Sequence, residues 1–268
     1  MYSDFVMSQK SISVASETIT TIEIGSLSLN ITNSMLTALL TCTFLMIGGI
    51  LLSLAIPNNR KSKVNKFQSF VELIGTSLYD LINGITRTNK VSTILFSLCG
   101  FFFAYIAIGS WVGLIPGVGQ LFIKNNEDEF VHLFRASTSD LSGTVALSVI
   151  AFVLIQFQGL RQLGLGYIFK FINFSSPINF FVGLLELISE VARLLSFSLR
   201  LFGNVFAGEV MLMIVGDLSR LTVKNFGFIG LPLPSLIIAL EFFVALIQAY
   251  VFVSLFLVFS SLAKEEAH

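Results

Sequence analysis

Charged residues are scarce in this chain of 268 residues. Asp, Glu, Lys and Arg together make up 12% of it, whereas a soluble domain is typically about one quarter charged. Hydrophobic residues make up 54%, Phe alone contributes 28 residues, and the mean hydropathy is +0.87. So much apolar surface requires lipid as its solvent. Sixteen basic and sixteen acidic residues cancel, so no basic excess indicates binding to nucleic acid.

Cysteine and histidine are also rare, with two residues of each. Cys42 and Cys99 lie inside apolar runs, at a spacing that fits neither a metal site nor a disulfide framework. We interpret both as small hydrophobic residues. The His-Glu-x-x-His motif of zinc hydrolases is absent from the sequence, which argues against an intramembrane hydrolase of that kind. We expect no metal ion and no cofactor.

Five apolar segments qualify as transmembrane helices or come close to the roughly 20 residues that one needs. They cover about residues 35–56, 91–114, 141–157, 177–216 and 233–263. The sequence therefore predicts an all-α polytopic membrane protein, with a polar N-terminal segment at 1–34 and a single membrane domain at 35–268. Residues 69–85 mix apolar and polar positions at helical spacing, which predicts an amphipathic interfacial helix.

The basic loops predict the orientation of the spans, because cytoplasmic loops carry an excess of Lys and Arg. Residues 58–66 hold four basic residues and no acid, whereas residues 124–140 hold four acids. The N-terminal segment should then lie outside and the C-terminal tail inside. The loop with Arg220 and Lys224 falls outside and mildly violates the rule.

The last two segments are too long for an upright crossing. Forty helical residues at 177–216 span roughly 60 Å, and residues 233–263 span roughly 45 Å, whereas the hydrocarbon core is about 30 Å thick. We therefore expect two long adjacent helices that form a tilted hairpin, a shape suited to packing against a curved partner.

Ionisable residues gather in this hairpin, although each costs several kcal/mol at membrane depth on insertion scales. The fourth segment contains Glu186, Glu190, Arg193, Arg200 and Glu209, and the fifth contains Glu241 and Gln248. At about 100° per residue, Arg200 and Asn204 share a stripe, while Glu209 points to the opposite side roughly 13 Å further along. The pattern favours two half-pathways for an ion, separated by a fixed positive charge.

Small residues accompany the arginine on one face of the same helix. Ser196, Gly203 and Ala207 follow a spacing of three to four residues around Arg200, which permits close approach of another helix. Two interpretations stay open: ordinary packing inside this chain, or a smooth surface past which a partner slides.

The run Ser198-Leu-Arg-Leu-Phe-Gly-Asn-Val-Phe-Ala-Gly-Glu209 resembles the signature of subunit a of F-type ATP synthases. The stretches 186–193, 113–117 and 138–140, and the terminal run around Glu241 and Gln248, resemble the same family, and the likeness covers most of the chain from about Gly109 onward. One departure is Leu194, which stands where many relatives have proline and leaves the helix straighter there.

The resemblance implies a role for each matching position. Arg200 matches the essential arginine that faces the carboxylates of the rotor ring. Asn204, Glu209 and Gln248 match polar residues of the outer half-channel and of the arginine's surroundings, and Glu241 stands where relatives carry histidine or an acid. On the inner side Glu186 matches an acid near the half-channel, and we add Glu190 to the proton pathway.

The resemblance further implies a proton-translocating stator subunit of the F0 sector, non-catalytic by itself. Its partners would be the c-ring, the peripheral-stalk b subunits, the lipid bilayer and the translocated H⁺. The bacterial-like sequence of the arginine run favours a bacterial plasma membrane, with a mitochondrial inner membrane or another organellar membrane as the alternative.

Several assignments stay open on the sequence alone. Asp140 either lines an outer proton entrance or caps the third predicted span. Arg193 either joins the arginine stripe or pairs with Glu190 or Glu186, of which pairing is favoured. The competing functions are an ion-coupled secondary transporter, which the lack of an internal repeat disfavours, and a passive structural subunit, which leaves Arg200 unexplained.

Overall fold

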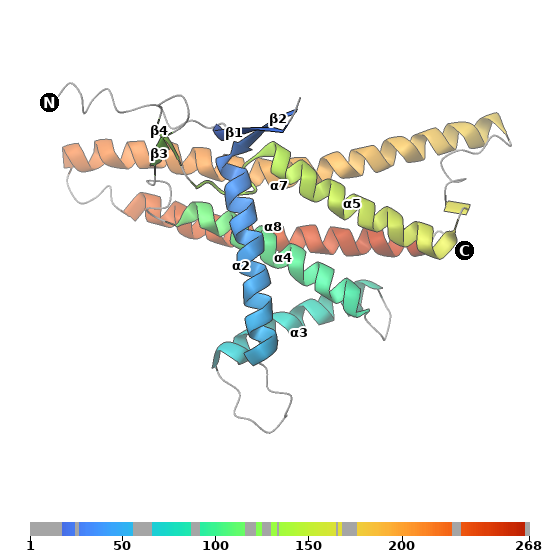
Figure 1. Ribbon diagram of the computed structural model, residues 1–268. Coiled ribbons are helices and arrows are strands. Elements are labelled where there is room, and N and C mark those ends of the chain that lie inside the picture. The colour runs from blue at the N-terminus through green and yellow to red at the C-terminus, as the bar shows by residue number, and fades with distance from the viewer. Residues whose placement is uncertain are drawn as a thin grey trace.

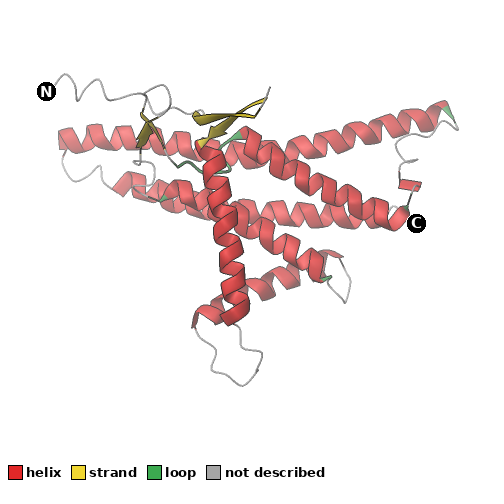
Figure 2. Ribbon diagram, in the orientation of Figure 1, coloured by secondary structure: helices red, strands yellow, loops and turns green. Residues whose placement is uncertain are grey.

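The computed structural model describes residues 18–24, 27–55, 66–86, 92–115, 122–124, 130–132, 134–164, 166–167, 176–226 and 232–265. Helices dominate these ranges (Figures 1 and 2), which confirms the predicted all-α class of a polytopic membrane protein. The long helices are α2 (Asn33–Ala55), α3 (Lys66–Thr86), α4 (Thr93–Leu114), α5 (Leu141–Leu163), α7 (Pro177–Phe226) and α8 (Pro232–Glu265).

Two short antiparallel hairpins were not predicted. Strands β1 (Thr18–Ile24) and β2 (Leu27–Thr32) pair with each other, as do β3 (Phe122–Lys124) and β4 (Phe130–His132). The first pair is rich in β-branched Thr and Ile at alternating positions, a composition that fits a strand. Because α2 begins directly after β2, this hairpin marks one end of α2.

Helices α7 and α8 run side by side along the molecule, while α2 stands across them (Figure 1). With 50 residues, α7 extends roughly 75 Å, far more than the thickness of a hydrocarbon core. If α2 follows the membrane normal, α7 and α8 are therefore strongly tilted. Helix α5 packs on both of them, and α4 packs on α8.

Two helices continue beyond their predicted ends. Helix α5 ends at Leu163 instead of residue 157, and α7 ends at Phe226 instead of residue 216. The predicted ends were the ends of apolar runs. A polar side chain such as Arg161 interrupts an apolar run but does not end a helix. The stop for α5 is Gly164, whose φ of 62° is a backbone conformation that favours glycine, and its N–H bonds to the carbonyl of Leu160.

Four helices in the described ranges are long and apolar enough to cross a membrane: α2, α4, α5 and α8. The prediction was about five spans, with residues 177–216 as the fourth. Ionisable residues interrupt α7 from Glu186 to Glu209, so its place in the membrane stays a prediction that rests on a function for those charges.

The core lies where α4, α7 and α8 meet. Phe102 of α4 contacts Phe252 and Phe256 of α8 at ring-centroid distances of 5.6 and 5.3 Å, and Phe197 of α7 contacts Phe252 at 5.0 Å. Cys99 is buried beside them, and both cysteines are free thiols, as interpreted from the sequence.

Helix α3 covers the predicted amphipathic segment. It buries Leu78 and Ile82 against α4 and α8, whereas Leu73 on its other side is 63% exposed. The apolar stripe of α3 thus packs on the helical bundle, which brings this helix to the end of α2 that lies away from the β1–β2 hairpin (Figure 1).

Candidate functional site

A small cavity between α4, α7 and α8 brings four of the predicted pathway residues together. Its polar lining comes from Asn204 and Glu209 of α7 and from Glu241 and Gln248 of α8, together with Ser110 of α4. The space amounts to about 20 Å³, which is room for about one water molecule. Two residues of α7 and two residues of α8, more than thirty positions further along the sequence, thus line one polar chamber.

A direct hydrogen bond joins the two amide side chains of this chamber. The Nδ2 of Asn204 donates to the Oε1 of Gln248 over 2.6 Å. Gln248 is buried, so the bond satisfies an acceptor that would otherwise be costly to bury. It also fixes the register of α7 against α8 one turn beyond Arg200.

The carboxyl group of Glu241 lies directly against the backbone of α7 at Gly208. A Cβ atom built at Gly208 would overlap the Glu241 carboxyl group. Only glycine leaves room here, so the close approach of the two helices places the acid of α8 inside the chamber next to Glu209.

Glu209 has a partner that the sequence analysis missed. The guanidinium of Arg135 donates to Glu209 Oε2 from Nη2 at 2.7 Å and from Nε at 3.2 Å. Its Nε also lies 2.9 Å from Ser139 Oγ. The side chains of Arg135 and Glu209 are only 11% and 24% exposed. Arg135 stands in a mostly acidic loop, two residues before a Ser-Thr-Ser-Asp run, and a cation at this place was the available signal.

Segment 134–140 is wedged among the helices, and this fixes Arg135. Ala136, Ser137, Thr138 and Ser139 are all buried. The hydroxyls of Thr138 and Ser110 lie 2.9 Å apart. A Cβ atom at Gly113 would meet the backbone of Ala136, so glycine lets the segment press against α4.

Asp140 caps α5, and it also ties the segment to α2. Its Oδ1 accepts from the backbone N–H of Ser142 at 3.2 Å, and its Oδ2 accepts from Ser34 Oγ at 2.7 Å. Burial raises the pKa of Asp140, but the hydrogen bonds from Ser34 and Ser142 and the charge of Arg135 outweigh it, so the pKa lies below its usual value. The helix cap is observed, and the proton entrance stays a prediction.

Arg200 stands apart from the chamber. Within the described ranges its guanidinium makes one hydrogen bond, from Nη2 to Ser196 Oγ at 3.0 Å, and no ion pair. Along the same stripe Ser196, Gly203 and Ala207 are exposed, and a Cβ atom built at Gly203 would touch nothing within 4 Å. The stripe of small residues is therefore not used for packing within the described chain.

A second polar cluster lies nearer the start of α7. Glu190 is 3% exposed; its Oε1 accepts from Arg193 Nη1 at 2.7 Å and its Oε2 accepts from Gln156 Nε2 at 2.9 Å. Tyr167 donates to Gln156 Oε1 at 2.6 Å. The guanidinium of Arg193 also lies 4.2 Å above the ring of Phe259. Arg193 thus pairs with Glu190, one of the two acids expected for it.

These groups follow one another along α7. Glu186 lies one turn before Glu190 and is half-buried. Arg200 comes seven residues after Arg193, roughly 10 Å along the axis, and Glu209 a further 13 Å or so. The cluster around Glu190, a cation without an ion pair among the described residues, and the acidic chamber therefore follow one another along α7. The sequence analysis missed Gln156 and Tyr167, which reach the cluster around Glu190 from outside the long hairpin.

Comparison with known proteins shows the family to which this chain belongs. The family model described as ATP synthase A chain matches residues 35–261. A protein named ATP synthase subunit a from Desulfotalea psychrophila is 35% identical over 206 residues, which cover 76% of this chain and 74% of that protein. A protein of the same name from Geobacter sp. strain M21 is 27% identical, over 84% of this chain and 86% of that protein. Another from Enterococcus faecalis is 30% identical, over 69% of this chain and 74% of that protein. The chain belongs to the ATP synthase A chain family.

Proposed function

We propose that this chain is the proton-translocating stator subunit of the F0 sector of an ATP synthase, in which Arg200 faces the moving carboxylates of a rotor ring. The observation that carries the proposal is the state of Arg200. It is a cation without an ion pair in the described part of the chain, beside an exposed stripe of small residues. A carboxylate of another molecule would supply the missing counter-charge, and membership of the family supports a ring carboxylate as that partner.

The physical role of Arg200 follows from electrostatics. An opposite charge within about 4–6 Å lowers the pKa of an acid by 1–3 units, so a ring carboxylate opposite Arg200 releases its proton. Away from the arginine, burial in lipid raises the pKa of that carboxylate and keeps it protonated. Arginine suits this place because it stays charged at every physiological pH, whereas a buried lysine can lose its proton.

The outer chamber supplies one route to the ring. Protons arriving from outside pass by way of Glu209 and Glu241, and Asn204 and Gln248 connect the chamber to the level of Arg200. Arg135 and Asp140, which lie at the outer end, form the entrance.

The inner cluster supplies the other route. Glu190 and Glu186 lie on the opposite side of Arg200 along α7, and a released proton leaves past them. The positive charge of Arg200 between the two routes repels a proton that would cross directly. Each charge that crosses 100 mV releases about 2.3 kcal/mol, so several protons cross for each ATP made.

The partners and the membrane follow from the same proposal. The exposed stripe of α7 faces the c-ring, and the apolar surfaces of the other helices face lipid and the b subunits of the peripheral stalk. All three relatives named above come from bacteria, which supports a bacterial plasma membrane.

Cysteine cross-linking tests this placement. In a background with Cys42 and Cys99 replaced by Ala, Ala207→Cys should cross-link to the ring subunit in membranes, because residue 207 lies on the stripe with Arg200. Leu195→Cys is the matched control, since Leu195 is 51% exposed but is turned about 140° from Arg200. Cross-links from residue 195 alone, or co-purification of the chain without any ring subunit, would refute the proposal.

A further inference from the structure

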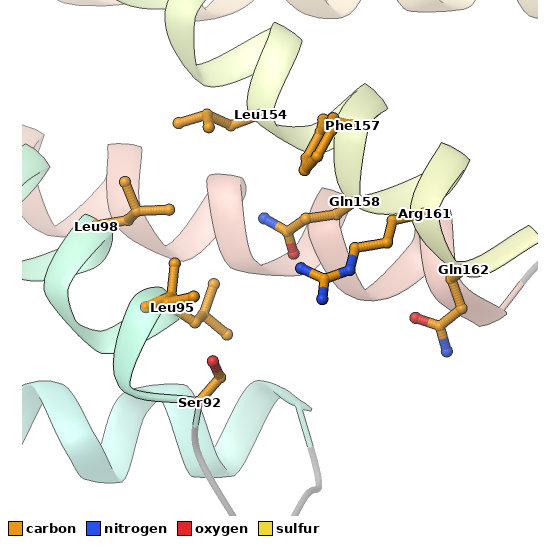
Figure 3. Close-up of a pocket in the computed structure, with 9 residues that line it drawn as sticks. Ser92, Leu95, Leu98, Leu154, Phe157, Gln158, Arg161 and Gln162 are labelled. Atoms are coloured by element: carbon orange, nitrogen blue, oxygen red, sulfur yellow. The ribbon is translucent and has the colours of Figure 1, made fainter. Parts of the chain in front are cut away.

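A cavity among the described residues lies away from both polar routes, between the first two turns of α4 and the last three turns of α5 (Figure 3). It measures about 470 Å³, which is within the range of sites that hold small molecules. Its lining is Ser92, Ile94, Leu95, Leu98, Leu154, Phe157, Gln158, Arg161 and Gln162. None of these residues belongs to the outer chamber or to the inner cluster.

The lining divides into an apolar and a polar part. Leu95 is buried and forms part of the floor, whereas Ile94 is 67% and Phe157 59% exposed. The cavity is thus a groove that opens toward the outside of the bundle, where an apolar membrane protein meets lipid. A wall of this kind accepts an acyl chain.

The polar part gathers at one end of the groove. Arg161 extends from the last turn of α5 into the space beside Gln158 (Figure 3). Gln158 Oε1 already accepts from Ser260 Oγ at 2.6 Å, and its Nε2 hydrogens can donate to a ligand. Within the described ranges no acidic side chain pairs with Arg161. A free guanidinium and amide donors together favour an anionic oxygen ligand.

The depth of this end matches a lipid head group. Ser92 precedes the first residue of α4 and Arg161 lies in the last turn of α5, so both stand at helix ends on one side of the bundle. The positive-inside rule places that side at the cytoplasmic surface, where bilayers present anionic head groups. An arginine on this surface pairs naturally with a lipid phosphate.

We infer that the groove between α4 and α5 is a binding site for an anionic phospholipid, with the head group at Arg161 and Gln158 and an acyl chain along Leu95, Leu98 and Phe157. The lipid fills a surface that the chain itself leaves open. It also joins α4, which packs on α8, to α5, which packs on α7 and α8.

Photoactivatable lipids test the site in membrane vesicles that contain the assembled complex. Two probes carry the same diazirine acyl chain, one with a phosphatidylglycerol and one with a phosphatidylcholine head group. The anionic probe should label peptides 92–98 and 154–162 about fivefold more than the zwitterionic probe, the preference expected from one basic side chain at a membrane surface. The exposed surface of α2 around Phe44 and Ile47 is the internal control and should react equally with both.

Substitutions separate charge from shape. Arg161→Gln should bring the labelling ratio of the two probes close to one, and Arg161→Lys should keep most of the preference. Ile94→Trp should lower labelling by both probes, because the indole fills the groove. Equal labelling of the unmodified chain, a ratio that Arg161→Gln leaves unchanged, or a groove protected from both probes by a neighbouring protein would each overturn the inference.

Discussion

Arg135 Nη2 lies 2.7 Å from Glu209 Oε2, although the two residues are 74 positions apart in the sequence. The contact joins the segment before α5 to the second half of α7. It gives the proposed outer route a cation at its entrance, opposite an acid that lines the chamber. A charged pair at this position either holds Glu209 in place for proton transfer or blocks it, and substitution distinguishes these effects.

We predict that Arg135→Gln and Glu209→Gln each slow proton flux through F0 by about tenfold without preventing assembly. Each removes one charge of a mostly buried ion pair, which is costly for the charge that stays. The double variant should be no slower than either single one, since contacting residues couple by about 0.5–3 kcal/mol. Passive proton uptake by vesicles measures all four rates. Faster flux in Arg135→Gln would show that the pair blocks the route, and strictly multiplicative effects would show that it plays no part.

The central cation makes a stronger prediction. Arg200→Ala should abolish ATP synthesis driven by a proton gradient in an otherwise assembled complex, because nothing then lowers the pKa of the ring carboxylate. Arg200→Lys should fail nearly as completely, since a lysine can discharge when it is buried and cannot reproduce the planar guanidinium. ATP synthesis in inverted vesicles, with subunit content checked by immunoblot, measures both. Normal coupled synthesis in either variant would refute the role of Arg200.

The position of Glu241 depends on a glycine. Gly208→Ala should displace the Glu241 carboxyl group from the chamber, because the added Cβ overlaps it, and slow proton flux several-fold. Gly216→Ala is the matched control on the same helix: a Cβ there meets nothing within 4 Å, and its effect on helix propensity is the same. If the two variants behave alike, the contact between Gly208 and Glu241 has no role in flux.

The sequence predicted the residues that α7 and α8 contribute to this site better than the others. Helical periodicity placed Glu241 and Gln248 on one face of the last helix. The packing of two long helices that are adjacent in sequence then brings that face to the residues of α7. Arg135 could not be placed in the same way, because its contact with Glu209 depends on how segment 134–140 packs against α4 through Gly113. Periodicity within one helix carries no information on that tertiary contact.

Helix ends and strands were missed for a related reason. An apolar window detects where lipid could surround a helix, not where hydrogen bonding stops, so α5 was predicted six residues too short. The β1–β2 hairpin lies in a segment that polarity alone describes as a tail. Its alternation of Thr and Ile is visible afterwards, but short strands of this kind give a weak signal.

Asp140 gives a prediction on pH. Its pKa in the folded protein lies below its usual value, which is about 3.9 for an unfolded Asp. The carboxylate therefore contributes stability fully above that value, and the contribution is lost as the pH falls through the lower folded pKa. Asp140→Asn keeps a good helix cap and removes the charge. The difference in thermal stability between the two proteins should stay constant from pH 8 to about pH 5 and shrink below about pH 4. A difference that grows in acid would contradict this sign.

The inner cluster provides the last test. Glu190 accepts from both Arg193 and Gln156, so Gln156→Leu removes one donor while the ion pair remains. Tyr167→Phe removes only the hydroxyl that orients Gln156. We expect Glu190→Ala to be the most damaging of the three, because among the described residues it leaves Arg193 with only its cation–π contact, and Tyr167→Phe to be the mildest. If Glu190 lies on the inner route, Gln156→Leu slows proton release on the inner side while cross-linking of Ala207→Cys to the ring is unchanged. Equal rates in all three variants would assign the cluster to structural support of α5 against α7 and remove it from the pathway.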